Sequence, residues 1–299
     1  MKMWNLVAVA LLASTAIQTV RADVLVLRPG GSSTTALLQF RDTNARLVEV
    51  LRADTEGFYG ATIGPDGAIY ATGNTLGYGT IYRFNSSGEL LGRFAGDNLK
   101  TPGNLKFGPD GNLYVLGSTW PDNPAQGLVV RYDGATGAFI DVMVANEAGG
   151  FTDLAFGRDG QLYLGDFNNG ILRYDATSGA LVPFVPAGTA GLNSAAAFVF
   201  GPEGDLYVCN RNSNAILRFN GRTGAPMRAF VPPGRGGLRA PSGIAFGKGC
   251  LFVSSSENNR ILKYNGRTGQ FLGAFIASHP EVVRPGRLVF LRTETEKKP

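Results

Sequence analysis

The sequence predicts an all-β fold, a closed ring of six four-stranded antiparallel sheets. Three observations favour it: a glycine-rich composition, a tight turn that recurs along the chain, and a strand pattern that repeats around each turn. Of the 299 residues, 42 are Gly and only 17% are charged. Glycine is about twice as frequent as in average proteins. No Gly-X-Y period is present, and 44% hydrophobic content is too high for a disordered chain. Many short strands joined by tight turns are therefore expected.

The recurring turn has the form Gly-Pro-Asp-Gly, and its last glycine returns every 44 to 49 residues. Glycine suits such turns because it adopts positive φ without steric cost. The last copy is shortened. The copies are Gly64-Pro65-Asp66-Gly67, Gly108-Pro109-Asp110-Gly111, Gly157-Arg158-Asp159-Gly160, Gly201-Pro202-Glu203-Gly204 and Gly247-Lys248-Gly249.

Each turn lies between a short apolar stretch and a strand that contains Tyr or Phe. A polar loop, an alternating strand, a second turn and a final strand follow, as in the copy that runs from Ile244 to Phe275. This amounts to four strands per repeat, with the period of two that strands buried between neighbouring sheets show. Four strands at this repeat length are typical of one blade of a β-propeller.

The two ends of the chain supply the sixth blade. Five full repeats occupy 58–285, and three strands are expected at 24–27, 37–40 and 47–51. The segment 285–290 resembles the innermost strand of a blade, compared with 241–246. One C-terminal strand and three N-terminal strands would close the ring, and closure removes the exposed sheet edges that promote aggregation.

The repeat resembles the NHL repeat. The resemblance rests on Phe-Gly-Pro-Asp-Gly-Asn-Leu-Tyr-Val at 107–115 and on Asn-Asn-Arg-Ile-Leu-Lys-Tyr at 258–264, and it extends over nearly all of the expected mature chain. NHL-like propellers include streptogramin lyases, gluconolactonase-like hydrolases, amidating lyases and many modules that bind partners. The resemblance therefore implies a fold, and the fold alone does not choose a function.

Residues 1–22 are expected to form a cleaved signal peptide, with a secreted or periplasmic destination. Lys2 provides a positive start, the run from Leu6 to Ile17 is too short to span a bilayer, and Val20-Arg21-Ala22 is a plausible cleavage site. A retained anchor is the alternative, although no stable membrane anchor is expected. The propeller is assigned to 23–292 and a short charged tail to 293–299.

The two cysteines, Cys209 and Cys250, are expected to remain free. Aligned repeats place Cys209 late in its strand and Cys250 at the start of the equivalent strand of the next repeat. The offset of four residues corresponds to roughly 13 Å, which is beyond disulfide reach.

The formal net charge of +5 falls to +3 when residues 1–22 are removed. The basic residues form no stripe of the kind that binds nucleic acid, so no nucleic-acid partner is expected. We expect a monomer that binds a small molecule or a protein on one face.

Ligands of such propellers generally enter at the face where loops between blades meet the loops between second and third strands. Trp120 in the longest of these loops is a candidate recognition anchor, although it can equally pack over its own loop. Arg211 lies in an Asn-rich loop that is a candidate for binding polar groups. Arg235 and Arg239 flank a Gly-rich connector and are candidates for binding an acidic ligand or partner. Each of these loops can equally be a plain connector.

Near the channel, the best polar pair is Asn104 and Asp153, which fall at equivalent positions of adjacent blades. In gluconolactonase-like propellers, carboxylate and amide side chains near these positions hold a divalent metal. Two oxygen-bearing side chains are few for a cation such as Ca²⁺, which prefers six or more oxygens. We therefore expect no cofactor or metal, and keep Asn104 and Asp153 as the candidate ligands if one binds.

Catalysis has little support in the sequence. His279 is the one histidine, so the paired histidines implied by the lyase resemblances are missing. The candidate catalytic residues are Asp153, Asn104, Arg287 and His279, with Arg287 as an oxyanion stabiliser. The first hypothesis is an extracytoplasmic binding propeller, and the sequence leaves open whether the protein has any enzyme activity. The alternatives are an atypical lyase or lactone hydrolase, and a structural component of an envelope or extracellular assembly.

Overall fold

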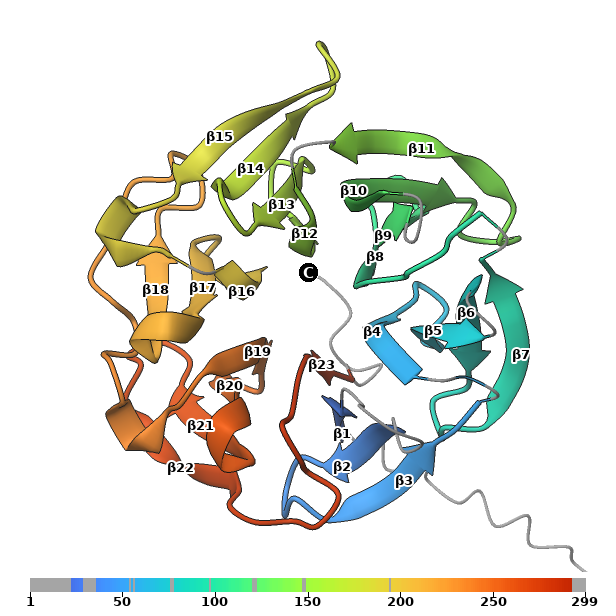
Figure 1. The fold of residues 1–299 in the computed structure, drawn as a ribbon. Helices are drawn as coiled ribbons and strands as arrows, with labels where there is room; N and C mark the ends of the chain where they lie inside the picture. Colours follow the sequence, from blue (N-terminus) through green and yellow to red (C-terminus); the bar gives the residue numbers. More distant parts are fainter. Residues whose placement is uncertain are drawn as a thin grey trace, which may run out of the picture.

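The computed structural model describes residues 23–28, 36–53, 55, 57–75, 78–96, 98–119, 123–146, 149–193 and 195–291. Its strands form six separate sheets arranged radially around a centre, as Figure 1 shows, and the prediction of a six-bladed propeller is confirmed. The signal-peptide interpretation of 1–22 and the tail at 293–299 lie outside the described residues.

The blades are numbered here from the one that holds both ends of the chain. Blade 1 contains β23 (Leu288–Phe290), β1 (Asp23–Arg28), β2 (Ala36–Arg41) and β3 (Leu47–Leu51). Blade 2 contains β4 (Gly57–Ile63), β5 (Ile69–Thr75), β6 (Tyr78–Phe84) and β7 (Leu90–Ala95). Blade 3 contains β8 (Leu105–Phe107), β9 (Leu113–Thr119), β10 (Asn123–Tyr132) and β11 (Phe139–Asn146).

The second half of the ring follows the same plan. Blade 4 contains β12 (Phe151–Phe156), β13 (Leu162–Asp166), β14 (Gly170–Asp175) and β15 (Ala180–Pro186). Blade 5 contains β16 (Ala195–Phe200), β17 (Leu206–Asn210) and β18 (Ala215–Phe219). Blade 6 contains β19 (Pro241–Gly247), β20 (Cys250–Ser255), β21 (Arg260–Asn265) and β22 (Phe271–Ile276). Short 3₁₀ turns are η1 (Thr189–Gly191), η2 (Arg211–Ser213), η3 (Arg235–Gly237) and η4 (Ser256–Asn258).

Blade 5 departs from the four-strand pattern at its outer edge. The segment 226–231 occupies the place of a fourth strand, but it forms isolated bridges to β18, at Pro226 and Val231, in place of a regular ladder. Pro226 has no N–H to give to a ladder, which prevents regular pairing at this end. Hydrogen bonds from Met227 N and Phe230 N to carbonyls of β18 hold the segment in place, both at 2.9 Å.

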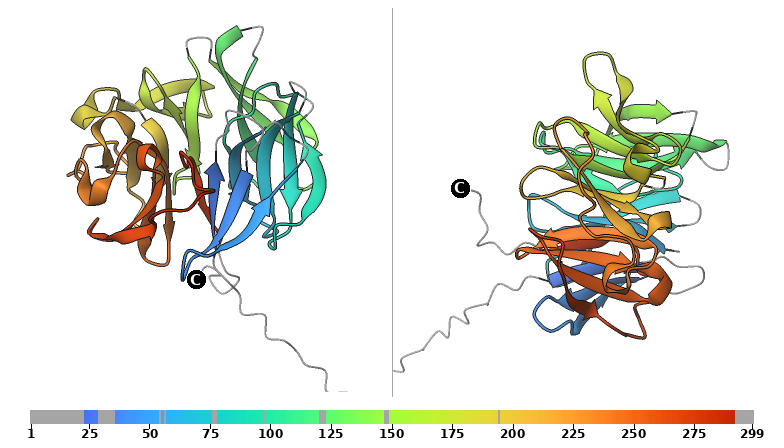
Figure 2. Two further views of the ribbon diagram at one scale, coloured as in Figure 1. Left: turned by 60° about the horizontal axis from the view of Figure 1, so that its bottom comes forward. Right: turned by 90° about the vertical axis from the view of Figure 1, so that its left-hand side faces the viewer.

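The ring closes as expected. β23 pairs antiparallel with β1, with Val24 opposite Phe290 and Val26 opposite Leu288. Figure 2 shows these first and last strands side by side in one sheet. The inner strand of every blade thus runs along the centre, which puts one short segment from each blade at the channel.

Aromatic side chains join neighbouring blades. In four successive blades the Tyr that follows the Gly-Pro-Asp-Gly-like turn meets, edge to face, the Phe that ends the inner strand of the next blade. The pairs are Tyr70–Phe107, Tyr114–Phe156, Tyr163–Phe200 and Tyr207–Phe246, with ring centroids 4.9, 4.9, 4.9 and 5.0 Å apart. Such aromatic pairs contribute about 0.5–1.5 kcal/mol each beyond their buried area.

The acidic residue of each turn fixes the same tyrosine. Tyr70, Tyr114 and Tyr163 donate their hydroxyls to Asp66, Asp110 and Asp159, each at 2.9 Å. Burial, together with the hydrogen bond to Asp66, raises the pKa of Tyr70 to about 12. The repeated turn therefore aligns the ring that packs against the next blade, which links the sequence repeat to the assembly of the propeller.

Candidate functional site

The inner strands carry a β-bulge near one end of the channel, and this bulge decides which side chain faces the centre. The register shifts between Phe151 and Asp153 in β12, and at the equivalent point of β4, β16 and β19. A bulge re-aims the side chain that follows it. The ring of residues at the channel therefore consists of the residues after the bulge and their equivalents in the other two blades: Gly60, Asn104, Asp153, Ala197, Gly243 and Arg287.

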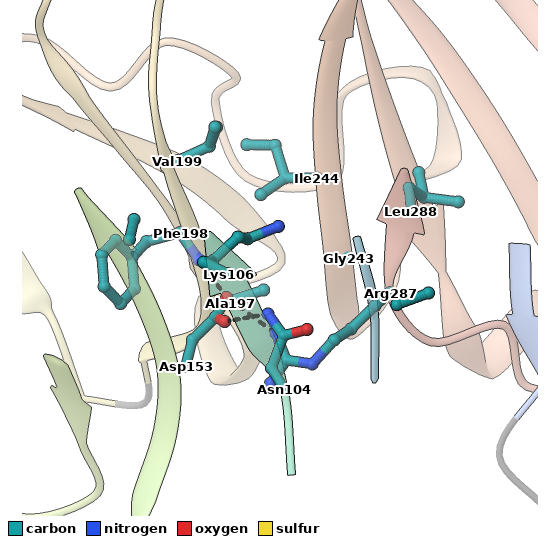
Figure 3. Close-up of a pocket in the computed structure, with 12 residues that line it drawn as sticks. Asn104, Lys106, Asp153, Ala197, Phe198, Val199, Gly243, Ile244, Arg287 and Leu288 are labelled. Carbon is teal, nitrogen blue, oxygen red and sulfur yellow. Dashed lines mark hydrogen bonds and ion pairs between the residues drawn. The ribbon is translucent and has the colours of Figure 1, made fainter. Parts of the chain in front are cut away.

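Three of these six positions are polar, and the structure brings all three together. Asn104 precedes β8 in blade 3, Asp153 lies on β12 in blade 4, and Arg287 precedes β23 in blade 1. Asn104 Nδ2 donates to Asp153 Oδ1 at 2.7 Å, which confirms their expected proximity. Arg287 reaches across from the opposite blade, with its Nη1 2.7 Å from Asp153 Oδ2 and its Nη2 donating to the carbonyl of Thr152 (Figure 3).

Backbone hydrogen bonds fix the main chain at Asn104 and Arg287, the two residues whose side chains contact Asp153. Leu116 N donates to the carbonyl of Asn104 at 2.8 Å, and Leu27 N donates to the carbonyl of Arg287 at 2.9 Å. Both residues are thus tied to the second strand of their own blade. The polar cluster is consequently built on sheet backbone, which is more rigid than a loop.

The carboxylate of Asp153 is fully engaged. Besides Asn104 and Arg287, the backbone N–H groups of Leu154 and Phe198 donate to it at 2.9 and 3.0 Å. The side chain is 4% exposed, and that of Arg287 is 17% exposed. A carboxylate with this many donors acts as a structural anion, and little of its lone-pair capacity is left for a metal or for a substrate proton.

Lys106 also lines the channel cavity, and it was not among the site residues predicted from the sequence. It lies on β8 two positions after Asn104, and residues two apart on a strand point to the same side. It therefore faces the channel while Leu105 is buried between blades. The alternation of Asn104, Leu105 and Lys106 in the sequence contained this signal.

The surroundings of Lys106 are mostly apolar. Ala155, Val199 and Ile244 line the same cavity, and Figure 3 shows the lysine extending into it below Val199 and Ile244. Burial lowers the pKa of the Lys106 amine; the charge of Asp153 opposes this effect and that of Arg287 adds to it. Among the described residues, no carboxylate lies within ion-pair distance of its Nζ.

The cavity that these side chains enclose has a volume of about 50 Å³. One water molecule requires about 10–15 Å³ by this measure, so the space fits about three to five water-sized groups. Pockets for drug-sized ligands are about 300–1,000 Å³. The cavity thus accommodates one small molecule or one functional group of a larger ligand.

Small residues shape the cavity at the remaining ring positions. A Cβ on Gly60 would lie 2.6 Å from Asn104 Cα, and a Cβ on Gly243 would overlap the backbone of Gly286. Both glycines therefore allow neighbouring inner strands to approach closely. Asn104 Oδ1, buried beside Gly60, has no hydrogen-bond partner among the described residues.

The other predicted site residues are not part of this cluster. His279 lies in the connection between β22 and β23, where its ring packs edge to face on Phe40 at 5.2 Å and its Nδ1 accepts from Glu281 N at 3.2 Å. It is not among the residues that line the cavity. The histidine thus has a local packing role in the structure.

The three candidate arginines on loops also lie outside the cavity lining. Arg211 begins η2, Arg235 begins η3, and Arg239 lies just before β19. The backbone carbonyls of Arg235 and Arg239 accept hydrogen bonds from Tyr264 and Ser255, which fixes the loop. Trp120 lies outside the described residues.

The described part of the chain holds no group of three or more His, Cys, Asp or Glu side chains placed to bind a metal. At the predicted pair, the guanidinium of Arg287 lies against Asp153 in the place that a cation would take. The donor set therefore does not fit a divalent cation. No helix within the described residues is long and apolar enough to cross a membrane.

Solved structures confirm the fold. A propeller chain in a nidogen/laminin complex superposes with a TM-score of 0.70 at 13% identity, covering 91% of this chain and 98% of that one. A periplasmic gluconolactonase from Pseudomonas aeruginosa gives 0.62 at 18% identity, covering 91% and 99%. A virginiamycin B lyase from Staphylococcus aureus gives 0.57 at 20% identity, covering 79% and 74%.

No protein-family model and no curated protein matches the sequence. At identities of 20% or less, the three structural similarities concern architecture alone. The chain is therefore similar in fold to a virginiamycin B lyase, to a periplasmic gluconolactonase and to a chain of the nidogen/laminin complex.

Proposed function

We propose that this protein is a binding propeller whose central channel captures a small carboxylate-bearing ligand. The observation that carries the proposal is the charge balance of the cavity. Two cations, Lys106 and Arg287, face one carboxylate, Asp153, and that carboxylate is already paired with Arg287. An anion that enters the cavity would meet the unpaired positive charge of Lys106.

The volume of the cavity limits the size of the ligand. About 50 Å³ suits acetate, formate or the carboxylate end of a larger molecule. Arginine and lysine are the side chains that recognise carboxylates, by planar hydrogen bonding and by point charge respectively. The apolar wall of Val199 and Ile244 excludes water and strengthens these interactions.

Binding is favoured over lactone hydrolysis or lyase chemistry. Those reactions need a base or a metal next to the substrate. Asp153 is occupied by four donors, and His279 packs on Phe40 away from the cavity lining. With a signal peptide at 1–22, the propeller would work outside the cytoplasm, which N-terminal sequencing of the exported protein would test.

Thermal melting tests the carboxylate proposal. The protein is melted in acetate and in chloride at equal ionic strength. A ligand present at 100 times its Kd stabilises by about 2.7 kcal/mol, or roughly 5 °C for a chain of this size. We expect this rise with acetate and its loss in Lys106→Met.

Lys263→Met is the matched control, since Lys263 lies over Phe252 in blade 6 and outside the cavity lining. It should keep the response to acetate. An equal melting temperature in acetate and chloride, or an unchanged response in Lys106→Met, would exclude the proposal. A parallel melt with EDTA and then with Ca²⁺ tests for a bound metal. A melting temperature that falls with EDTA and is restored by Ca²⁺ would favour a metal site.

A further inference from the structure

Lys106 lies in the channel rather than on the outer surface of the propeller, and this environment suits a reactive amine. Its side chain enters a small cavity whose walls at the same level are Ala155 and Val199, and it pairs with no carboxylate among the described residues. Lys248 pairs with Asp42 at 2.6 Å, Lys263 lies over the ring of Phe252, and neither lysine lines the cavity. Of these three lysines, Lys106 is the one that lines the channel cavity.

Two features of this environment raise the share of neutral amine above that of a solvated lysine, while the ammonium form stays available to bind an anion. Partial removal from water disfavours the ammonium ion, and the nearby guanidinium of Arg287 repels it, which together lower the pKa despite the opposing charge of Asp153. A lysine that is desolvated, or that lies next to another cation, is the kind that enzymes use to attack carbonyl carbons.

We propose that Lys106 forms a reversible imine with the carbonyl carbon of a small oxo acid held in the channel. The neutral Nζ attacks the carbonyl carbon, and a C–N bond forms. One proton of the amine and the proton that the ammonium form released pass to the carbonyl oxygen. The C–O bond then breaks, the C=N double bond forms, and the oxygen leaves as water. The product is a protonated imine, so the single positive charge of the ammonium form is conserved and no oxidant or reductant is consumed.

An oxo acid fits this position better than a simple aldehyde. Its carboxylate supplies the negative charge that the protonated imine needs in an apolar cavity, and Arg287 offers a further cationic partner. A molecule of about five heavy atoms, such as glyoxylate, matches the space of roughly three to five water-sized groups. This inference rests on the proposed carboxylate binding and adds a covalent step to it.

Reductive trapping tests the inference. The protein is incubated with glyoxylate and cyanoborohydride, and peptide mapping by mass spectrometry measures carboxymethyl addition at each lysine. We expect Lys106 to be modified at least about tenfold faster than Lys248 or Lys263. This factor is a small part of the rate increase that positioning a reactant beside a nucleophile can supply. Acetaldehyde at the same concentration should modify Lys106 much more slowly, because it lacks the carboxylate.

The outcomes separate this inference from the function on which it rests. If acetate raises the melting temperature but glyoxylate modifies Lys106 no faster than Lys248 or Lys263, carboxylate binding stands and the imine is excluded. If acetaldehyde modifies Lys106 as fast as glyoxylate, selection for an oxo acid is excluded. Acetate added as a competitor should slow trapping at Lys106 and leave Lys263 unchanged, and the absence of competition would also contradict the inference.

Discussion

Replacing Asp153 by Ala tests how much the channel cluster contributes to stability. The substitution removes a carboxylate that is 4% exposed and leaves the guanidinium of Arg287 without its partner. The N–H groups of Leu154 and Phe198 and the amide of Asn104 lose their acceptor as well. Breaking a buried ion pair on one side costs about 3–5 kcal/mol. We expect a loss in this range because these donors cannot all be re-satisfied by water in a small cavity.

Asp141→Ala is the matched control, because it removes the same atoms from an exposed ion pair. Asp141 contacts Arg131 at 2.5 Å, but its side chain is 42% exposed. Exposed pairs contribute about 0.2–1 kcal/mol. The two substitutions should therefore differ severalfold in the free energy of unfolding that they cost, although each removes a carboxylate that faces an arginine.

Equilibrium unfolding in urea measures the free energy of unfolding of both variants. An unchanged dependence of this free energy on urea concentration would show that unfolding exposes the same surface in each. At about 2 °C per kcal/mol for a chain of this size, Asp153→Ala should also melt roughly 6–10 °C lower. Where Asp153→Ala does not fold, Asp153→Asn keeps the shape and should lose less. A loss under about 1 kcal/mol for Asp153→Ala, similar to that of Asp141→Ala, would refute the view that the cluster is buried and fully paired.

Three further outcomes are expected. Lys106→Met should be more stable than the parent at neutral pH. The folded-state pKa of Lys106 is lowered, so the parent gains stability as the pH rises toward about 10.4, and the difference between the two should shrink there in pH-dependent melts. Gly243→Ala should lose about 1–3 kcal/mol in urea unfolding because the new methyl group overlaps the next inner strand, whereas Gly150→Ala, with open space around it, should be close to neutral. A thiol reagent should modify the half-buried Cys250 in the folded protein and reach the buried Cys209 only on unfolding, since burial also raises the pKa of that thiol.

The free state of both cysteines agrees with the sequence prediction. Cys209 lies opposite Ala197 in β17, near the end of the strand, and Cys250 is the first residue of β20. Strand register was enough for this prediction, because the repeat aligns equivalent strands to within a residue.

The channel site was only partly predictable. Asn104 and Asp153 were expected to be neighbours because they occupy equivalent positions in adjacent blades, and their hydrogen bond confirms it. The pairing of Arg287 with Asp153 was not foreseen, since it joins opposite blades and depends on the diameter of the closed ring. Lys106 was not predicted as a site residue, because a lysine between apolar residues of a strand matches neither a metal-ligand pattern nor a histidine-based acid/base pattern.

The sequence by itself determined the repeat, the blade count, the closure through both ends and the level of the polar ring. These features follow from local rules, because turn chemistry and strand alternation act between residues close in the chain. Only the tertiary structure decided what the channel contains. A bulge turns Asp153 inward, glycines bring strands together, and Arg287 spans the centre to meet it. Such contacts depend on how six separate sheets pack around one axis, which no local pattern encodes.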